Sequence, residues 1–114
     1  MLKGEWIKRE GYEKKIFFDE NDLSCKGSLV QVVRLYPKTE NKPHYHKIQT
    51  EVFVTTSGNG IIVKNNEKHR MKVGDIMICK PGDVHYVIND KDVNFDILVF
   101  KTNYVDDKDF YLEK

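Results

Sequence analysis

The sequence predicts an all-β protein, folded as a sandwich or a barrel. Short runs rich in Val, Ile, Phe, Tyr and Thr are separated by Gly, Asn, Asp and Pro, which is typical of strands joined by turns. No long stretch places apolar residues at positions i, i+3, i+4 and i+7, so we expect no helix. About nine short strands follow one another closely, and a small antiparallel sheet must close or double over to bury its edges.

The strands can be assigned in order from their apolar and β-branched segments. KIFFD comes first, then LVQVVRLY, and then KPHYH, which precedes EVFVTTS. GIIVK and KHRMK follow, and the Asn65-Asn66 pair suits a two-residue hairpin turn near them because Asn tolerates positive φ. IMIC, HYVIN and VNFDILVFK complete the series. We therefore expect strands over residues 15–19, 29–36, 42–46, 51–57, 60–64, 68–72, 76–79, 85–89 and 93–101.

A chain of 114 residues fits a single domain, 1–114, by size. Residues 1–14 form a charged N-terminal arm that also carries Trp6, Ile7 and Tyr12. We expect this arm to pair with an edge strand, either of its own chain or of a partner. The tail, 102–114, is acidic. A homodimer would cover edge strands and a broad outer sheet, and we predict one.

The composition argues against several classes of protein. Apolar residues make up 39% and charged residues 32%, as in globular domains, and the net charge of +1 gives no electrostatic footprint for nucleic acid or an anionic membrane. The start lacks the apolar segment of a signal peptide, and no apolar run approaches the roughly 20 residues that cross a bilayer. We expect a cytoplasmic location, where Cys25 and Cys79 would stay reduced.

Three histidines and a glutamate form the most informative pattern. His44 and His46, two residues apart, share one face of a strand. Glu51 would face the other side of a straight strand, so we expect a reversal after His46 that lets Glu51 open the next strand. His85 begins a strand after a Pro-Gly turn, and a closed sheet can bring it beside the first pair. Such a cluster suits Mn, Fe, Co, Ni, Cu or Zn as the bound metal. The side-chain amide of Gln49 is a weaker alternative to Glu51 as the fourth ligand.

These residues carry a resemblance to a known family. HYHKIQTEVFVTTSG, from His44 to Gly58, resembles the first motif of the cupin superfamily, and GDIMICKPGDVHYVIN, from Gly74 to Asn89, resembles the second. Lys80 departs from the family's usual Pro. The resemblance covers residues 29–100, which would form the core of a small jelly roll, or double-stranded β-helix barrel. It implies a small-molecule ligand and one divalent transition metal per chain (Mn, Fe, Ni or Zn), held by His44, His46, Glu51 and His85.

Catalysis requires a further group beside such a metal. Arg34, the only charge within LVQVVRLY, would hold a carboxylate or phosphate if it faces the cavity. Tyr36 is a candidate proton donor, whereas Tyr45 and Tyr86 alternate with the histidines and should face away. The resemblance implies an enzyme of the sugar-phosphate isomerase, dioxygenase or decarboxylase type that acts on a small polar metabolite. The alternative is a non-catalytic sensor that binds a small molecule or metal.

Overall fold

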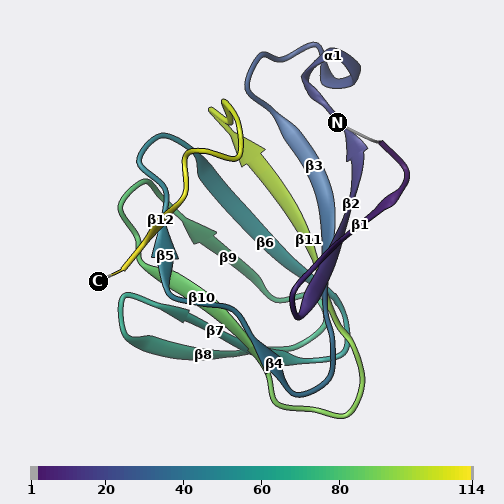
Figure 1. Cartoon of the computed structure of the whole chain (residues 1–114), viewed down its shortest axis with the longest axis vertical. Coiled ribbons are helices and arrows are strands. Elements are labelled where there is room, and N and C mark those ends of the chain that lie inside the picture. Colours follow the sequence, from purple (N-terminus) through teal and green to yellow (C-terminus); the bar gives the residue numbers. More distant parts are fainter. Residues whose placement is uncertain (1–2, 114) are drawn as a thin grey trace.

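Two facing antiparallel β-sheets make up the computed structural model, which describes residues 3–113 (Figure 1). The first sheet holds, in spatial order, β1 (Trp6–Arg9), β2 (Tyr12–Phe18), β3 (Leu29–Leu35), β11 (Phe95–Thr102), β6 (Thr50–Ser57) and β9 (Ile76–Cys79). The second holds β12 (Tyr111–Leu112), β5 (His44–Tyr45), β10 (His85–Asn89), β7 (Gly60–Lys64) and β8 (Glu67–Met71), with β4 (Thr39–Glu40) paired to β10. The predicted all-β, jelly-roll architecture is confirmed.

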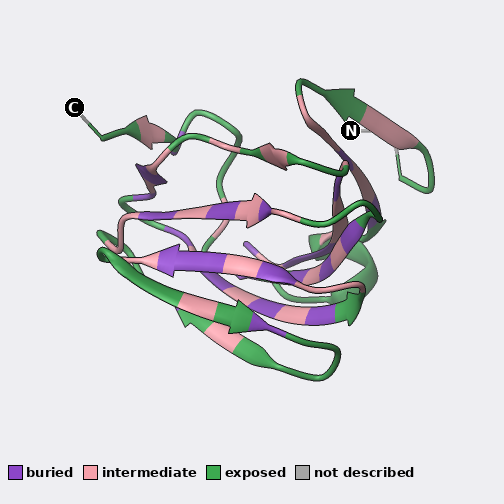
Figure 2. Cartoon of the chain, turned by 90° about the horizontal axis from the view of Figure 1, so that it is seen from below, coloured by how far each residue is buried: buried purple, intermediate pink, exposed green. Residues whose placement is uncertain are grey.

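The core lies between the sheets because side chains alternate between inward and outward positions along each strand. In β6, Glu51, Phe53 and Thr55 are buried while the residues between them are half-buried. Figure 2 shows the same alternation of buried and partly buried residues along the central strands. Nine buried side chains form the apolar core: Leu35, Phe53, Ile62, Met71, Cys79, Val87, Phe95, Ile97 and Val99.

One short helix, α1 (Glu20–Leu23), departs from the expectation of no helix. The Asp19 carboxylate caps it by accepting hydrogen bonds from the backbone N–H groups of Asn21 and Asp22, at 3.0 and 3.1 Å. The Asp22 carboxylate in turn accepts a hydrogen bond from the Asp19 N–H at 3.0 Å, and this second bond completes a capping box. A single turn held by local capping has no apolar periodicity, so the sequence pattern gave no sign of it. No helix in the described residues is long and apolar enough to span a membrane.

The N-terminal arm pairs with its own chain in this structure. β1 and β2 form a hairpin, and β2 adds to β3 in the first sheet. The predicted Asn65-Asn66 turn is confirmed, since both residues have positive φ, 50° and 70°. Asn89 has a structural role, because its side-chain amide donates hydrogen bonds to the carbonyls of Leu35, Tyr36 and Val93.

Candidate metal centre

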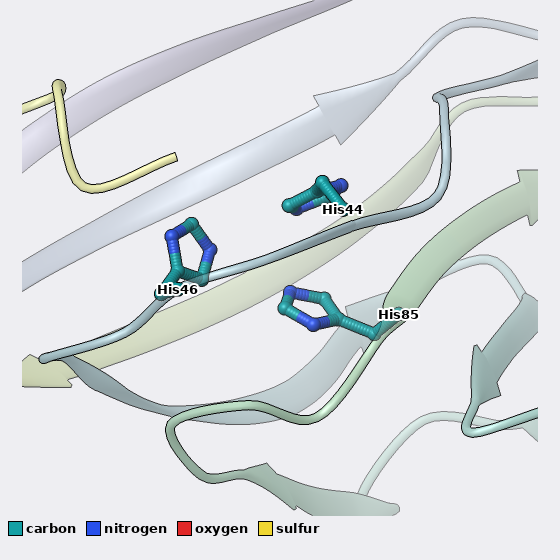
Figure 3. A group of neighbouring side chains, drawn as sticks. All are labelled: His44, His46 and His85. Atoms are coloured by element: carbon teal, nitrogen blue, oxygen red, sulfur yellow. The ribbon is translucent and has the colours of Figure 1, made fainter. Parts of the chain in front are cut away.

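His44 and His46 face the interior from β5 and the residue that follows it. Both are buried, at 7% and 9% exposure, while Tyr45 between them turns outward and stacks on Tyr111. His85, the first residue of β10, is the direct cross-strand partner of His44. The three rings face one common space from these two segments (Figure 3). One nitrogen from each ring lies within 4.8 Å of the other two.

Glu51 joins this group because the chain reverses before it. β5 ends at Tyr45 and β6 begins at Thr50, so the predicted break between the two strands is confirmed. Asp109 holds the reversal together, since its carboxylate accepts the N–H groups of Lys47, Ile48 and Gln49 at 2.8, 3.0 and 3.0 Å. Glu51 then lies on the inward face of β6 with 7% exposure.

Backbone carbonyls orient all three histidine rings. The Nδ1 atoms of His44, His46 and His85 contact the carbonyl oxygens of Lys42, Asp109 and Asp83, at 2.7, 2.5 and 2.9 Å. A carbonyl oxygen can only accept, so each Nδ1 carries the proton and each Nε2 is left to face the centre. Carbonyl partners of this kind orient metal-binding histidines in proteins. Burial also lowers the pKa of His44 to about 4, which keeps this ring neutral near pH 7.

The Glu51 carboxylate lies against two ring nitrogens of the histidine cluster. Its Oε1 lies 2.8 Å from Nε2 of His46 and 3.3 Å from Nε2 of His85, yet it is a buried oxygen with no hydrogen-bond partner among the described residues. Burial raises the pKa of Glu51, but attraction to the His46 and His85 rings in their protonated form and to the ammonium of Lys101 outweighs that effect and holds the pKa well below the usual range. Glu51 is therefore an anion whose oxygen faces two ring nitrogens.

These distances fit the ligand shell of a transition metal. Two ligands that meet one ion at right angles, each about 2.0–2.2 Å from it, lie about 2.8–3.1 Å apart. The contacts from Glu51 to His46 and His85 fall at or close to that range. Three imidazole nitrogens and one carboxylate also match the ligand preferences of Mn, Fe, Ni and Zn.

A cavity of about 320 Å³ opens beside the cluster. Apolar residues of both sheets form much of its wall, among them Val33, Leu35, Phe53, Val87, Ile97 and Val99. Three buried polar atoms on the wall have no hydrogen-bond partner in the described chain: Oε1 of Gln31, Nε2 of Gln49 and Oε1 of Glu51. Since such atoms are costly to bury alone, they favour a polar ligand in this space. Gln49, the alternative to Glu51 as a ligand, is thus a wall residue of the cavity.

Arg34 and Tyr36 do not reach the cavity. β3 turns Gln31, Val33 and Leu35 inward, so Arg34 faces outward and forms a two-bond ion pair with Asp96 at 2.9 and 3.1 Å. Tyr36 donates a hydrogen bond to Glu13 at 3.2 Å. The structure gives neither residue contact with the site. Tyr45 and Tyr86 likewise are not part of the cavity wall, as their alternation with the histidines predicted.

Sequence reasoning missed several residues that surround the cluster. Lys101 continues the inward alternation of β11 after Ile97 and Val99, so its position in the strand was a usable signal. Lys14 reaches the cavity from the N-terminal hairpin. Asp109 lies far along the chain from the histidine it supports, and nothing in its local sequence indicated that contact.

The C-terminal segment covers one side of the cluster. The ring of Phe110 stacks on His44, with centroids 4.6 Å apart and planes 24° from parallel. Because Phe110 is 47% exposed, this ring lies between the cluster and the molecular surface.

The fold and the cluster together define a small β-barrel with a histidine–carboxylate site of the kind that binds transition metals. Residues 31–101 match the Cupin domain family, and the chain belongs to that family. An uncharacterized protein of Aquifex aeolicus (strain VF5) is 31% identical over 75 residues, which span 66% of this chain and 61% of the relative. The match therefore covers less than two thirds of that relative.

Solved structures share the fold at low sequence identity. KdgF from a Halomonas species has a TM-score of 0.79 and 16% identity, with 91% of this chain and 90% of that chain covered. A predicted oxalate decarboxylase of Thermotoga maritima has a TM-score of 0.77 and 18% identity, covering 90% and 93%. A cupin sugar phosphate isomerase of Silicibacter pomeroyi DSS-3 has a TM-score of 0.72 and 23% identity, covering 92% and 77%.

Proposed function

We propose that this protein is a metal-dependent enzyme that acts on a small polar metabolite. His44, His46, His85 and Glu51 would hold one divalent transition metal per chain: Mn, Fe, Ni or Zn. Two observations carry this proposal: the three histidines each offer a ring nitrogen within 4.8 Å of the others, and the Oε1 atom of Glu51 lies 2.8 and 3.3 Å from Nε2 of His46 and His85. Bound there, the metal would polarise a substrate oxygen or take part in redox chemistry.

The chain's own residues would prepare the site for that chemistry. The carbonyls of Lys42, Asp83 and Asp109 fix the ring orientations, and the apolar wall limits water around the substrate. The likeness to a sugar phosphate isomerase and a predicted oxalate decarboxylase favours isomerisation or decarboxylation, and a dioxygenase is the third type that the donor set allows.

Metal analysis of the untagged protein tests the site directly. After separate loading with Mn(II), Fe(II), Ni(II) or Zn(II) and desalting, we expect about one equivalent per chain of at least one metal, and almost none in H44A/H46A. His69 lies outside the cluster on β8, so H69A serves as the control and should load like the wild type. Loading that is weak in the wild type, or unchanged in H44A/H46A, would refute the proposal.

A non-catalytic sensor that binds a small molecule or metal is the second candidate. The observation that favours it is the Phe110 ring, which stacks on His44 and covers one side of the cluster. Oxygen uptake, sugar-phosphate isomerisation and decarboxylation of small acids by the loaded protein distinguish the two. Turnover that is lost in H44A/H46A supports the enzyme, whereas ligand-dependent thermal stabilisation without turnover across the panel supports the sensor.

We also propose a cytoplasmic homodimer. Both cysteines are free, with Cys25 exposed and Cys79 buried, which suits a reducing compartment. The dimer would form through the outer face of the first sheet.

A further inference from the structure

A buried cation lies in the cavity beside the metal cluster. Lys101 is the direct cross-strand partner of Glu51, is only 8% exposed, and lines the cavity. Its Nζ lies 4.8 Å from the centre of the Tyr104 ring, but no carboxylate of residues 3–113 comes within 4.0 Å of it. Burying an ammonium group without a close counter-charge is costly. The position therefore favours an anion supplied by a ligand.

A second lysine lies on the same wall. Lys14 extends from β2 with a side chain only 13% exposed, and its Nζ lies 3.8 Å from Asp107, whose own side chain is 63% exposed. An ion pair at that distance with a solvated partner is weak. Burial lowers the pKa of Lys14, and repulsion from Lys101 acts in the same direction although Asp107 opposes both. Both lysines therefore line the same cavity.

Gln31 lies between the two lysines on this wall. Its cross-strand partners are Ile16 on β2 and Val99 on β11, and Lys14 and Lys101 each stand two residues from one of these partners. Gln31 is 3% exposed, and its Oε1 has no donor among the described residues. An oxygen of this kind accepts a hydrogen bond from a hydroxyl group.

Four carboxylates also line the cavity, and one of them, Glu51, is the cross-strand partner of Lys101. Asp109 is occupied by three backbone N–H groups, and Glu51 faces His46 and His85. Asp106 and Asp107 are exposed. Arg9 is a third cation among the lining residues.

We propose that Lys101 and Lys14 bind the anionic group of the substrate, a carboxylate or a phosphate, and that Gln31 accepts a hydrogen bond from a hydroxyl beside it. The substrate class is then a small hydroxylated organic anion, such as a hydroxy acid or a sugar phosphate. The inference that this ligand is a substrate rests on the proposed function. Binding of an anion to Lys101 and Lys14 can be measured in both metal-loaded and metal-stripped protein.

Two matched pairs of probes test the subsite. Malonate and tartronate are carboxylates that differ by one hydroxyl, and propyl phosphate and glycerol 3-phosphate are phosphate monoesters with the same carbon chain that differ only in hydroxyl groups. Binding is followed by NMR titration at constant ionic strength, with Ni(II)-loaded and with metal-stripped protein. We expect saturable binding of at least one pair, and the pair that binds more tightly identifies the anionic group.

Variants assign the binding to the three residues. K101M should weaken the probes about tenfold or more, since a charged hydrogen bond is lost, while K101R keeps the charge and should retain most of the affinity. K14Q should lower the affinity for the probes by a smaller factor than K101M does. Lys15, the next residue, faces outward over the Trp6 ring, so K15Q is the charge-matched control and should bind like the wild type. Q31L should abolish the advantage of the hydroxylated member of each pair.

The results separate this inference from the metal proposal. Absence of saturable binding, or equal losses in K101M and K15Q, would overturn the anion subsite even if the protein binds metal. Lys101-dependent binding in a protein that takes up no metal would uphold the subsite and refute the metal proposal. A Q31L protein that still prefers the hydroxylated probes would remove Gln31 from the assignment. Wild-type-like thermal melts establish that each variant is folded.

Discussion

Asp109 connects the C-terminal segment to the metal cluster through both its side chain and its backbone. The carboxylate accepts hydrogen bonds from three successive backbone N–H groups of the β5–β6 reversal. The backbone carbonyl of Asp109 accepts a hydrogen bond from Nδ1 of His46. Burial raises the pKa of this carboxyl, but the three N–H donors outweigh it and lower the pKa overall. One residue therefore fixes the geometry that places His46 and Glu51 together.

We predict that D109N destabilises the protein and weakens metal binding. The amide replaces one carboxylate oxygen by an NH₂ group that faces backbone donors, so a buried N–H loses its acceptor at a cost of about 1–3 kcal/mol. Metal affinity should fall about 10- to 100-fold, as for other residues that orient ligands. Urea unfolding of metal-stripped protein measures the loss of stability. Competition with a chelator measures the loss of metal affinity.

The control for D109N is a carboxylate with no such contacts. Asp92 has a side chain that is 91% exposed and lies 3.8 Å from Lys38, so D92N should change stability by less than about 0.5 kcal/mol. If D109N behaves like D92N in both measurements, the reversal does not depend on the Asp109 carboxylate.

Alternation along a strand explains which parts of the site the sequence could predict. A break after His46 restarts the alternation of side chains, so the facing of Glu51 followed from its place near the start of the next strand. In β3 both faces carry apolar residues, because Val30 and Val32 lie on the outer side and Val33 and Leu35 on the inner side. The sequence pattern therefore did not predict whether Arg34 faces the cavity or the outer side of the sheet.

The N-terminal hairpin shows a second limit of sequence patterns. Its strands are rich in Lys and Glu, which is typical of solvent-exposed segments, and yet Lys14 reaches the cavity. Only the pairing of β2 with β3 brings that side chain to the site, and this pairing joins residues far apart in the sequence. The cluster itself was predictable because the spacing of its ligands matches the family motifs.

Close packing at the start of β7 makes Gly60 a sensitive position. A Cβ there would lie 2.4 and 2.6 Å from ring carbons of Phe95 and 2.8 Å from the Ile88 carbonyl oxygen. Phe95 is fully buried, so its ring has little room to move. We predict that G60A lowers the free energy of unfolding by about 1–3 kcal/mol in urea denaturation.

A double-mutant cycle assigns this cost to Phe95. Because leucine lacks the ring atoms that clash, the cost of G60A in the F95L background should be smaller by about 0.5–3 kcal/mol. Gly74 is the control, since a Cβ there meets nothing within 4 Å, and G74A should add to F95L without coupling. Additive costs for G60A and F95L would contradict the proposed overlap.

The outer face of the first sheet carries two apolar rows. Cross-strand pairing aligns one row of Val30, Phe100, Val52 and Ile78, and a second row of Val32, Leu98, Val54 and Ile76. Phe100, Ile78 and Ile76 are 42%, 41% and 67% exposed. A continuous apolar patch on a monomer usually marks an interaction site. The neighbouring row is charged, since it holds the Arg34–Asp96 pair with Glu13 on the other side of Arg34.

A second copy of the chain fits this face, because two apolar rows of the same shape can pack against each other under two-fold symmetry. We predict a homodimer by size-exclusion chromatography with light scattering at micromolar concentration. F100K places an ammonium at the middle of the patch and should give a monomer, since burying the unpaired charge costs several kcal/mol. Val93 is 62% exposed in the loop before β11, so V93K adds the same charge outside the patch and should remain dimeric. A monomeric wild type would refute the dimer, and an F100K protein that stays dimeric would place the interface elsewhere.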